Sequence, residues 1–345
     1  MAAGGRKYFV NAYINIRVLR DTHKCTLPIE LFYAGHDEMP AAAVTYMQNT
    51  FANLRLIDVY SVADMPALDR PNLSGFSIKA VAILLSSFEE VLFLDADSFP
   101  IANPKEAFYF PQYKATGALF WPSMCNCYTI RPRAYDVLGM SRPSTYMVLQ
   151  DHEYVRWTES CDANEPQEFE TGQMVLHKAR AWRGLMMTSY LSWWYRDLVL
   201  PHLMHGDPAV FQLAFEATNT PYEVVNKPMY FHGIATAQTT DGKQFFCGNG
   251  FSQVHPITGR PFFIHRSLTK FMAWPAEDYL SHNPIPRTWT HIARQADNKK
   301  AWIAAERKKA NVPVGVWHPG GNNAQKYCWY PEDNHAEISE APENV

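Results

Sequence analysis

The strongest constraint on the fold is an alternation of helical and strand-like segments in the first hundred residues. Apolar residues recur at helical spacing in three segments, and short apolar runs separate them. We expect helices at residues 10–20, 40–51 and 75–87, and strands at residues 27–33, 54–59 and 90–94. Strands separated by helices need crossover connections, so this order predicts an α/β fold with a doubly wound, mostly parallel sheet. Ligands bind such sheets beyond the carboxyl ends of the strands.

The second half of the chain has a more irregular pattern. Strands are expected at residues 117–121, 172–176, 222–226 and 261–265, and helices at residues 181–199 and 207–217. Residues 298–311 are rich in lysine and arginine and predict a solvated basic helix. With 345 residues, 47% of them hydrophobic, and no repeat or linker, the chain is expected to form one domain over residues 1–330. The acidic, proline-containing tail, residues 331–345, is expected to be disordered.

The charge balance excludes some classes of partner. Lys and Arg number 31 against 34 Asp and Glu, which gives a formal net charge of −3 and argues against a nucleic-acid partner. No apolar run approaches the roughly 20 residues of a spanning helix, so no membrane span is predicted in this chain. The six cysteines form no CxxC pair, which makes a zinc site unfavourable and leaves disulfides and buried thiols both open.

Two acidic residues, Asp95 and Asp97, directly follow the expected strand at residues 90–94. Carboxylates at positions i and i+2, where the chain turns at a strand end, can face one ion. Hard cations such as Mn²⁺ and Mg²⁺ prefer oxygen ligands and share them with substrate phosphates. Apolar sequence on both sides argues against an ordinary solvated turn. The sequence therefore predicts a divalent metal site that also binds a nucleotide-sugar.

A third metal ligand is expected from elsewhere in the chain. His265 ends the apolar run at residues 261–265, and a neutral imidazole suits Mn²⁺. Lys270, five residues later, would reach the phosphates of a nucleotide-sugar. From the local sequence alone, a core histidine with satisfied hydrogen bonds is an equally good interpretation of His265.

The stretch from residue 79 to residue 97 resembles the donor-site segment of retaining GT-A glycosyltransferases. More closely, the chain resembles the fungal Golgi α-mannosyltransferases that add α-1,2- or α-1,3-linked mannose. The order and spacing of several short stretches carry this resemblance. They are residues 27–31, 95–97, 116–122, 170–173, 205–207 and 263–266.

The resemblance implies a GT-A-like domain with a Rossmann-type sheet flanked by helices and a more irregular acceptor-side half. Residues 8–115 would form the nucleotide-sugar half, residues 116–275 the sugar and acceptor half, and residues 276–330 a C-terminal extension. It also implies a set of site residues. These are the metal ligands Asp95, Asp97 and His265, the donor contacts Lys79, Asp95 and Lys270, and the catalytic-site residues Asp207, Glu170 and Gln173.

The activity that the resemblance implies is transfer of mannose from GDP-mannose to a glycan of a glycoprotein or cell-wall mannan. The reaction would retain the anomeric configuration, depend on Mn²⁺ or Mg²⁺, and take place in the Golgi. Asp207 would touch the transferred hexose, and it is also a candidate N-cap of the helix at residues 207–217. Residues 193–195, Trp-Trp-Tyr, are candidates for acceptor contact, although at least one of these rings is expected in the core.

The chain departs from the family pattern at two places. Ser123 stands where the related enzymes carry an acid. In the family, a strand with the nucleobase contacts precedes the segment that here reads residues 3–10, so we expect the chain to lack that first strand and an upstream membrane anchor. Three other functions therefore stay open: a glycan-binding protein with little or no activity, a transferase that uses a UDP-sugar, and a metal-dependent phosphoester hydrolase.

Overall fold

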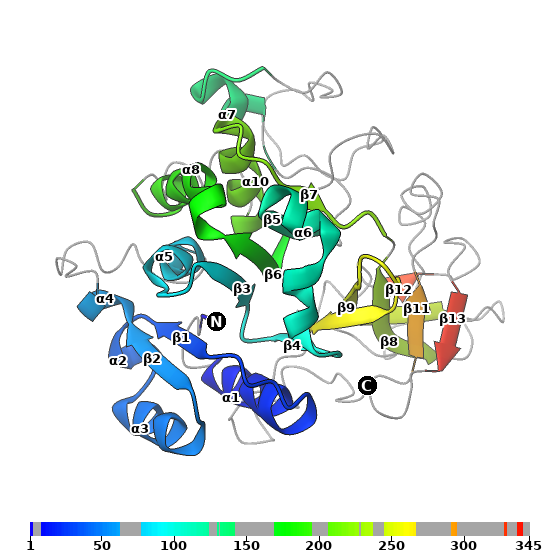
Figure 1. The fold of residues 1–345 in the computed structure, drawn as a ribbon. Helices are drawn as coiled ribbons and strands as arrows, with labels where there is room; N and C mark the ends of the chain where they lie inside the picture. Colours follow the sequence, from blue (N-terminus) through cyan, green and yellow to red (C-terminus); the bar gives the residue numbers. More distant parts are fainter. Residues whose placement is uncertain are drawn as a thin grey trace. The chain divides into compact units, whose positions relative to one another are not determined.

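The structure is a computed structural model, and Figure 1 shows its ribbon. It describes residues 1–2, 8–62, 77–123, 130, 132–141, 169–194, 206–227, 229–236, 245–266, 291–294, 328–329 and 337–340. The chain divides into two compact units. The first unit comprises Met1–Ala96 and Asn103–Val225, and the second comprises Asp97–Ala102 and Asn226–Val345.

The first unit begins with a two-stranded parallel sheet and its helices (Figure 1). Strand β1 (Ile29–Tyr33) pairs with β2 (Leu54–Asp58) in parallel, from Ile29 opposite Leu54 to Tyr33 opposite Asp58. The helical elements of this part are α1 (Phe9–Arg17), the π-helix η1 (Val18–Thr22), α2 (Gly35–Glu38), α3 (Ala41–Thr50) and α4 (Val59–Val62).

Strand β1 is buried on both of its faces, which explains the consecutive apolar residues Leu31, Phe32 and Tyr33. Leu31 and Tyr33 pack with the apolar residues of α1 and α3, whereas Phe32 belongs to the other core of this unit. Successive side chains of a strand point to opposite faces, so a strand covered on both faces needs apolar residues at consecutive positions.

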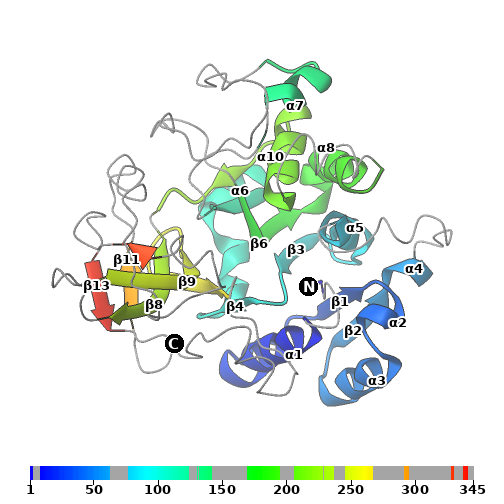
Figure 2. The same ribbon diagram turned by 180° about the vertical axis from the view of Figure 1, so that it is seen from behind.

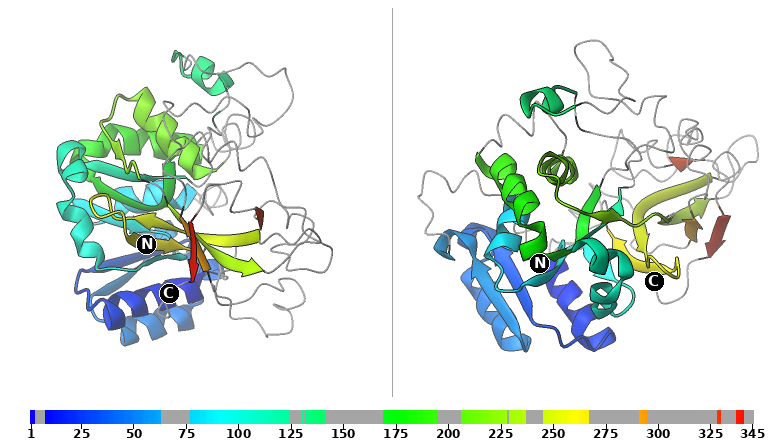
Figure 3. Two further views of the ribbon diagram at one scale, coloured as in Figure 1. Left: turned by 90° about the vertical axis from the view of Figure 1, so that its right-hand side faces the viewer. Right: turned by 45° about the horizontal axis from the view of Figure 1, so that its top comes forward.

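A four-stranded sheet in the order β3-β6-β5-β7 forms the rest of the first unit. Its strands are β3 (Glu90–Leu94), β5 (Ala118–Pro122), β6 (Phe169–His177) and β7 (Glu223–Val224). The helices are α5 (Ile78–Leu85), the 3₁₀ helix η4 (Pro104–Tyr109), α6 (Pro111–Thr116), α7 (Pro132–Val137), α8 (Lys178–Ser189), the π-helix η5 (Tyr190–Trp194) and α10 (Asp207–Ala217). The apolar residues of helices α5, α8 and α10 share one core with this sheet. Figure 3 shows the ribbon of these helices and strands from two further sides.

The predicted α/β class is confirmed, and parallel pairing is present between β1 and β2 and between β5 and β7. Strand β6, however, runs antiparallel to both of its neighbours, β3 and β5. The expectation of a mostly parallel sheet therefore does not hold for these central strands. Residues 142–168, which precede β6, lie outside the described residues. Their sequence does not indicate whether β6 runs parallel or antiparallel to β3 and β5.

The first two residues of the chain lie beside the carboxyl ends of two strands. Ala2 forms isolated parallel bridges to Phe32 of β1 and to Asp95, the residue after β3. The amino group of Met1 donates a hydrogen bond of 2.8 Å to the carbonyl of Glu30, and the Met1 carbonyl accepts one of 3.0 Å from the Phe32 amide. These contacts place Ala2 next to both Phe32 and Asp95.

The second unit contains an antiparallel sheet, and Figure 2 labels its strands β4, β8, β9, β11 and β13. Its path is β13-β11-β8-β9-β10-β4, and β12 also pairs with β9. The strands are β4 (Ser98–Pro100), β8 (Tyr230–Thr236), β9 (Phe245–Val254), β10 (Pro261–His265), β11 (His291–Arg294), β12 (Cys328–Trp329) and β13 (Glu337–Glu340).

The sheet of the second unit includes four residues of the tail. Within residues 331–345, which were expected to be disordered, Glu337–Glu340 form β13, which pairs with β11 and has Ile338 opposite Ala293. The pattern Glu-Ile-Ser-Glu offers only one apolar side chain, so the sequence carries little strand signal without the partner strand. The basic helix expected at residues 298–311 lies outside the described residues. Within the described part of the chain, no helix has both the length and the apolar character to cross a bilayer.

Candidate functional site

Lys79 occupies the centre of a buried charged cluster in the first unit. Its Nζ atom lies 2.6 Å from Oδ2 of Asp207 and 2.7 Å from Oδ2 of Asp95. The same atom lies 3.4 Å from both the carbonyl oxygen and the Oγ1 of Thr171. Lys79 is 7% exposed and Asp207 is 5% exposed. The cluster therefore joins one cation to two carboxylates with little access for water.

Three separate elements bring these side chains together. Helix α5 is buried from Ile78 to Ile83, so Lys79 enters the interior with its apolar neighbours. Asp95 follows β3, and its amide donates a 2.8 Å hydrogen bond to the carbonyl of Gly172 in β6. Asp207 is the first residue of α10 and follows Gly206, whose φ of 82° is a left-handed conformation that favours glycine.

Asp207 is not the N-cap of α10, which was one interpretation of its place in the sequence. Gly206 is the N-cap of α10, and no side chain caps this helix end by a hydrogen bond. Asp207 lies one residue further into the helix, where a negative charge still interacts favourably with the helix dipole. Its carboxylate instead contacts Lys79 and accepts a hydrogen bond from the Thr171 hydroxyl. The side chain is therefore held towards the cluster rather than towards the end of its own helix.

The electrostatics of the cluster favour a charged Lys79. Burial opposes the charge, but the neighbouring carboxylates of Asp207 and Asp95 outweigh burial and place the pKa of Lys79 above its usual range. A buried ammonium without partners would instead lose its proton. Lys79 therefore remains a cation at neutral pH and balances negative charge on the two acids.

Strand β6 supplies Glu170, Thr171 and Gln173, all of them buried. Alternate residues of a strand share a face, so Thr171 and Gln173 lie on the same face and Glu170 on the opposite one. The Glu170 carboxylate accepts a 2.7 Å hydrogen bond from the Gly172 amide. The family resemblance pointed to Glu170 and Gln173 but not to Thr171, whose contacts to Lys79 and Asp207 appear only in the folded chain.

Asp97 and His265 lie together in the second unit. Asp97 directly precedes β4 and His265 ends β10, and these strands pair antiparallel with His265 opposite Ser98. The Arg266 amide donates a 3.0 Å hydrogen bond to the Asp97 carbonyl. Nε2 of His265 lies 3.5 Å from Oδ1 of Asp97. The ring of Phe251 packs beside the imidazole at a centroid distance of 5.1 Å. The sheet thus directs the imidazole of His265 towards the Asp97 carboxylate.

Asp95, Asp97 and His265 are the described residues that offer a set of ligand atoms for a metal ion. Only Ala96 separates the two aspartates along the chain, so covalent connection keeps the two carboxylates near each other. Two carboxylates and one imidazole suit Mn²⁺ and related divalent ions. This donor set fits the metal site expected from the sequence.

The structure describes only some of the remaining candidate residues. Ser123 follows β5 and is buried. The ring of Trp193 packs against the core of the first unit, which agrees with the expectation that one of these aromatic residues is structural. Lys270, Tyr195 and the side chain of Trp194 lie outside the described residues.

The chain is similar to several known proteins. Saccharomyces cerevisiae alpha-1,2-mannosyltransferase MNN5 is 27% identical over 267 residues, which cover 67% of this chain and 45% of MNN5. Candida albicans alpha-1,2-mannosyltransferase MNN24 is 26% identical over 242 residues, which cover 65% of this chain and 33% of MNN24. The chain thus spans less than half the length of these curated relatives.

Two solved structures have a weaker likeness to this chain. The galactosyltransferase LgtC in complex with donor and acceptor sugar analogs is 16% identical, with a TM-score of 0.37, over 62% of this chain and 69% of LgtC. Apo mouse xyloside xylosyltransferase 1 is 13% identical, with a TM-score of 0.38, over 63% of this chain and 79% of that protein. Likenesses of this degree identify neither the fold nor the activity of this chain.

A family model gives a firmer assignment. The model described as "Mannosyltransferase putative" matches residues 1–255, which contain Lys79, Asp95, Asp97 and Asp207. The match covers well over half of the chain. The chain therefore belongs to the mannosyltransferase family that this model describes.

Proposed function

We propose that this chain is a retaining α-mannosyltransferase that moves mannose from GDP-mannose to a hydroxyl of a glycan, with a divalent ion bound at the donor. The observation that carries the proposal is the buried cluster in which Lys79 joins Asp95 to Asp207. Asp95 belongs to the candidate metal ligands, and Asp207 is the residue expected at the sugar. The family assignment supports this interpretation.

Asp95, Asp97 and His265 would hold the ion, for which Mn²⁺ is the best fit and Mg²⁺ the second. When bound, a divalent ion supplies positive charge to a departing diphosphate, which otherwise leaves poorly. Asp95 follows the paired strand β3, and Asp97 and His265 lie at the antiparallel pair of β4 and β10, so the backbone of each candidate ligand is well anchored. Rigid support of this kind limits the reorganisation needed during the reaction.

Among the residues that the structure describes, Asp207 is the group best suited to face the reacting sugar carbon. The bond between the sugar C1 and the donor phosphate oxygen breaks with its electron pair on the phosphate, so positive charge develops at C1 as in glycoside hydrolysis. The new bond forms between C1 and the acceptor oxygen, and the acceptor proton passes to a phosphate oxygen. A fixed carboxylate stabilises the developing positive charge.

Lys79 and Thr171 would position Asp207 rather than react. Lys79 contacts the Oδ2 atom of Asp207, and the Thr171 hydroxyl donates a hydrogen bond to the same oxygen. These two contacts restrict the rotation of the carboxylate. Lys79 also contacts Asp95, so it connects the residue proposed at the metal with the residue proposed at the sugar.

The finer assignments rest on the family resemblance. They comprise GDP-mannose as donor, a glycan of a glycoprotein or cell-wall mannan as acceptor, and the Golgi as compartment. A binding assay separates the donor from its alternatives. Thermal unfolding is measured with GDP, GDP-mannose, UDP and UDP-sugars, each with and without Mn²⁺, since a ligand that binds only the folded state raises its stability. We expect the guanosine compounds with Mn²⁺ to give the largest increase.

The decisive experiment measures mannose transfer from GDP-mannose to an α-mannoside with Mn²⁺ and with a chelator. We expect activity only with the metal, and its loss in Asp97→Ala. The matched control is Asp37→Ala, which removes an equal charge from an exposed site in α2. Transfer that persists in the chelator would refute the metal assignment. A folded protein that binds glycan but transfers no sugar from any nucleotide would instead be a glycan-binding protein.

A further inference from the structure

A shallow hollow of about 540 Å³ lies in the surface of the first unit, between the start of α8 and the turn that joins α5 to β3. Two short segments line it. They are residues 87–89 of the turn, which read Ser-Phe-Glu, and Lys178, Ala179 and Trp182 of α8. None of these residues belongs to the candidate site, so the hollow is a separate feature of the surface.

The hollow and the candidate site lie at opposite ends of β6. Lys178 directly follows this strand, whereas Thr171, near its start, contacts Lys79. A strand rises by about 3.3 Å per residue, so Thr171 and His177 are roughly 20 Å apart. A ligand in the hollow would therefore be held away from the reacting sugar and from the candidate metal ligands.

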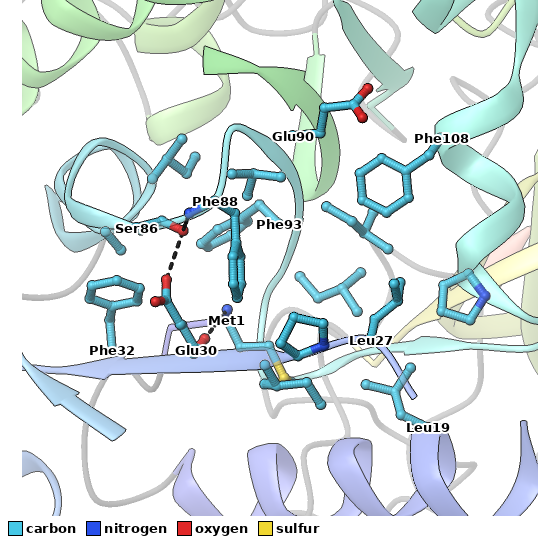
Figure 4. Close-up of a pocket in the computed structure, with 18 of the residues that line it drawn as sticks. Met1, Leu19, Leu27, Glu30, Phe32, Ser86, Phe88, Glu90, Phe93 and Phe108 are labelled. Atoms are coloured by element: carbon cyan, nitrogen blue, oxygen red, sulfur yellow. Dashed lines mark hydrogen bonds between the residues drawn. The ribbon is translucent and has the colours of Figure 1, made fainter. Parts of the chain in front are cut away.

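The turn at residues 86–89 is fixed from the inside by Glu30 of β1. The Glu30 carboxylate is buried and accepts hydrogen bonds of 2.7 Å from the hydroxyls of both Ser86 and Ser87. The Ser87 amide donates to the same carboxylate at 3.1 Å. Figure 4 shows the bond between Ser86 and Glu30, and the ring of Phe88 from the same turn. A turn that is already held in place loses little freedom when a ligand binds, which favours affinity.

Lys178 fixes the same turn from the side of α8. Its amide donates a 2.8 Å hydrogen bond to the Glu89 carbonyl, and its ammonium group donates to the carbonyls of Leu84 at 3.0 Å and Ser86 at 2.5 Å. The positive charge of Lys178 is therefore directed at backbone oxygens. The Glu89 carboxylate lies 3.5 Å from Nε2 of His177. These contacts favour a neutral ligand in the hollow over an ion.

Trp182 and Glu89 give the hollow the two kinds of contact that a sugar ring needs. Trp182 is 48% exposed, and the Glu89 side chain is 73% exposed. One face of a pyranose carries C–H bonds and is apolar, whereas its edge carries hydroxyls. An indole ring offers a large, rigid apolar surface to such a face, and a carboxylate accepts hydrogen bonds from hydroxyls.

The exposed apolar surface continues from Trp182 along the helix. Met186 and Tyr190 follow at intervals of four residues and are 45% and 46% exposed. Residues four apart lie on the same side of a helix, and eight residues rise by roughly 12 Å. This track is longer than one sugar ring but much smaller than a stable protein interface, which takes about 20–30 residues a side. Its size therefore favours a chain of sugars over a protein partner.

We propose that this hollow, continued by Met186 and Tyr190, is a surface glycan-binding site that takes the rings of a neutral mannose polysaccharide. The indole of Trp182 packs against the apolar face of one ring, and Glu89 accepts hydrogen bonds from its hydroxyls. The identity of the sugar as mannose rests on the proposed function. A polymer held here stays close to the enzyme, which raises the effective concentration of its ends at the candidate site.

The test measures how strongly soluble, neutral α-mannan retards the full chain in native gels, without nucleotide and with a chelator. The variants are Trp182→Ala and Glu89→Gln. The matched control is Tyr109→Ala, which removes another exposed aromatic side chain, from η4. Thermal unfolding of each variant verifies that it is folded. We expect Trp182→Ala to weaken mannan binding on the order of tenfold, Glu89→Gln to weaken it by a smaller factor, and Tyr109→Ala to bind as the wild type does.

Equal retardation of the wild type and Trp182→Ala would overturn the proposal, as would a wild type that does not bind α-mannan. Light scattering without mannan measures the oligomeric state. A dimer of the wild type that Trp182→Ala dissociates would assign this surface to a second copy of the chain and would also overturn the proposal.

The proposed function is tested separately by transfer from GDP-mannose to methyl α-mannoside, an acceptor with a single ring. Trp182→Ala should leave this transfer unchanged and should raise the KM only for the polymeric acceptor. A wild type that binds mannan through Trp182 but transfers no sugar would support the surface site and would count against the proposed function alone.

Discussion

Lys79 and Asp207 form an ion pair whose Nζ–Oδ2 distance is 2.6 Å, and both side chains are buried. The same ammonium group binds Asp95 at 2.7 Å. One lysine on α5 therefore holds the first residue of α10 and the residue after β3. In this arrangement, a change to Lys79 should affect folding as well as the candidate site.

Replacement of Lys79 by methionine should destabilise the chain. It leaves the buried carboxylate of Asp207 and the partly buried one of Asp95 without their cation, and breaking a buried ion pair costs about 3–5 kcal/mol. Urea unfolding measures the loss of free energy. The double variant Lys79→Met with Asp207→Leu should recover part of it, because it removes one of the two carboxylates. If the double variant is less stable than Lys79→Met, the proposed charge balance is wrong.

Replacement of Asp207 by asparagine should lower kcat by roughly 10² or more with little change in KM for the donor, as loss of an electrostatic contact to the reacting carbon predicts. Steady-state kinetics with GDP-mannose measure kcat and the KM for the donor. Thr171→Val is the companion variant, because it removes only the hydroxyl that donates to Asp207. Its kcat should fall less. A kcat near that of the wild type in Asp207→Asn would remove Asp207 from the mechanism.

Replacement of His265 by alanine should weaken Mn²⁺ binding without unfolding the sheet. The imidazole contributes one of three proposed ligands, while the backbone pairing of β10 with β4 and β9 does not need the side chain. Titration with Mn²⁺, followed by thermal unfolding, measures the apparent affinity. His255→Ala serves as a histidine control, since His255 does not belong to the proposed ligand set. Equal Mn²⁺ affinity in both variants would argue for a structural His265.

The stability of the chain should fall in acid partly because of His232. Burial, with a smaller effect of Arg266, lowers the pKa of His232 from 6.5 to about 3. Below pH 6.5 the unfolded chain binds a proton that the folded chain excludes, so this residue favours folding above that pH. Its contribution declines by about 1.4 kcal/mol per pH unit as the pH falls towards 3. Unfolding at several pH values should show a shallower dependence for His232→Gln than for the wild type.

Replacement of Gly184 by alanine should disturb the packing of α8 against α10. A Cβ atom at Gly184 would lie 2.7 Å from the Phe215 ring, which is fully buried. Overpacking of this kind costs about 1–3 kcal/mol, although alanine is the better helix former. Chemical unfolding measures the change. Arg183→Ala, on an exposed position of the same helix, should have little effect, and a stabilised Gly184→Ala would show that the ring moves aside easily.

Local sequence patterns located most of the described elements. The predicted strand at residues 261–265 coincides with β10, and the predicted helix at residues 207–217 coincides with α10. The acids after β3 were identified from their strand-end position. These predictions worked because the period of apolar residues and the position of turns are properties of a short stretch of chain.

The partners and directions of paired strands were less predictable from the sequence. The antiparallel direction of β6 and the pairing of β13 with β11 depend on where distant segments return. Local pattern carries no such information, because a strand that is buried on both faces looks alike in parallel and antiparallel sheets.

The sequence by itself determined which residues can serve the site: Asp95 and Asp97 after a strand, His265 at the end of another, and Lys79 and Asp207 in two helices. Only the tertiary structure decided that Lys79 joins Asp95 to Asp207 and that Thr171 also contacts them. Ion pairs depend on distances of a few ångströms between atoms from segments far apart in the chain. Packing of α5, α10 and β6 sets those distances, and no local period encodes them.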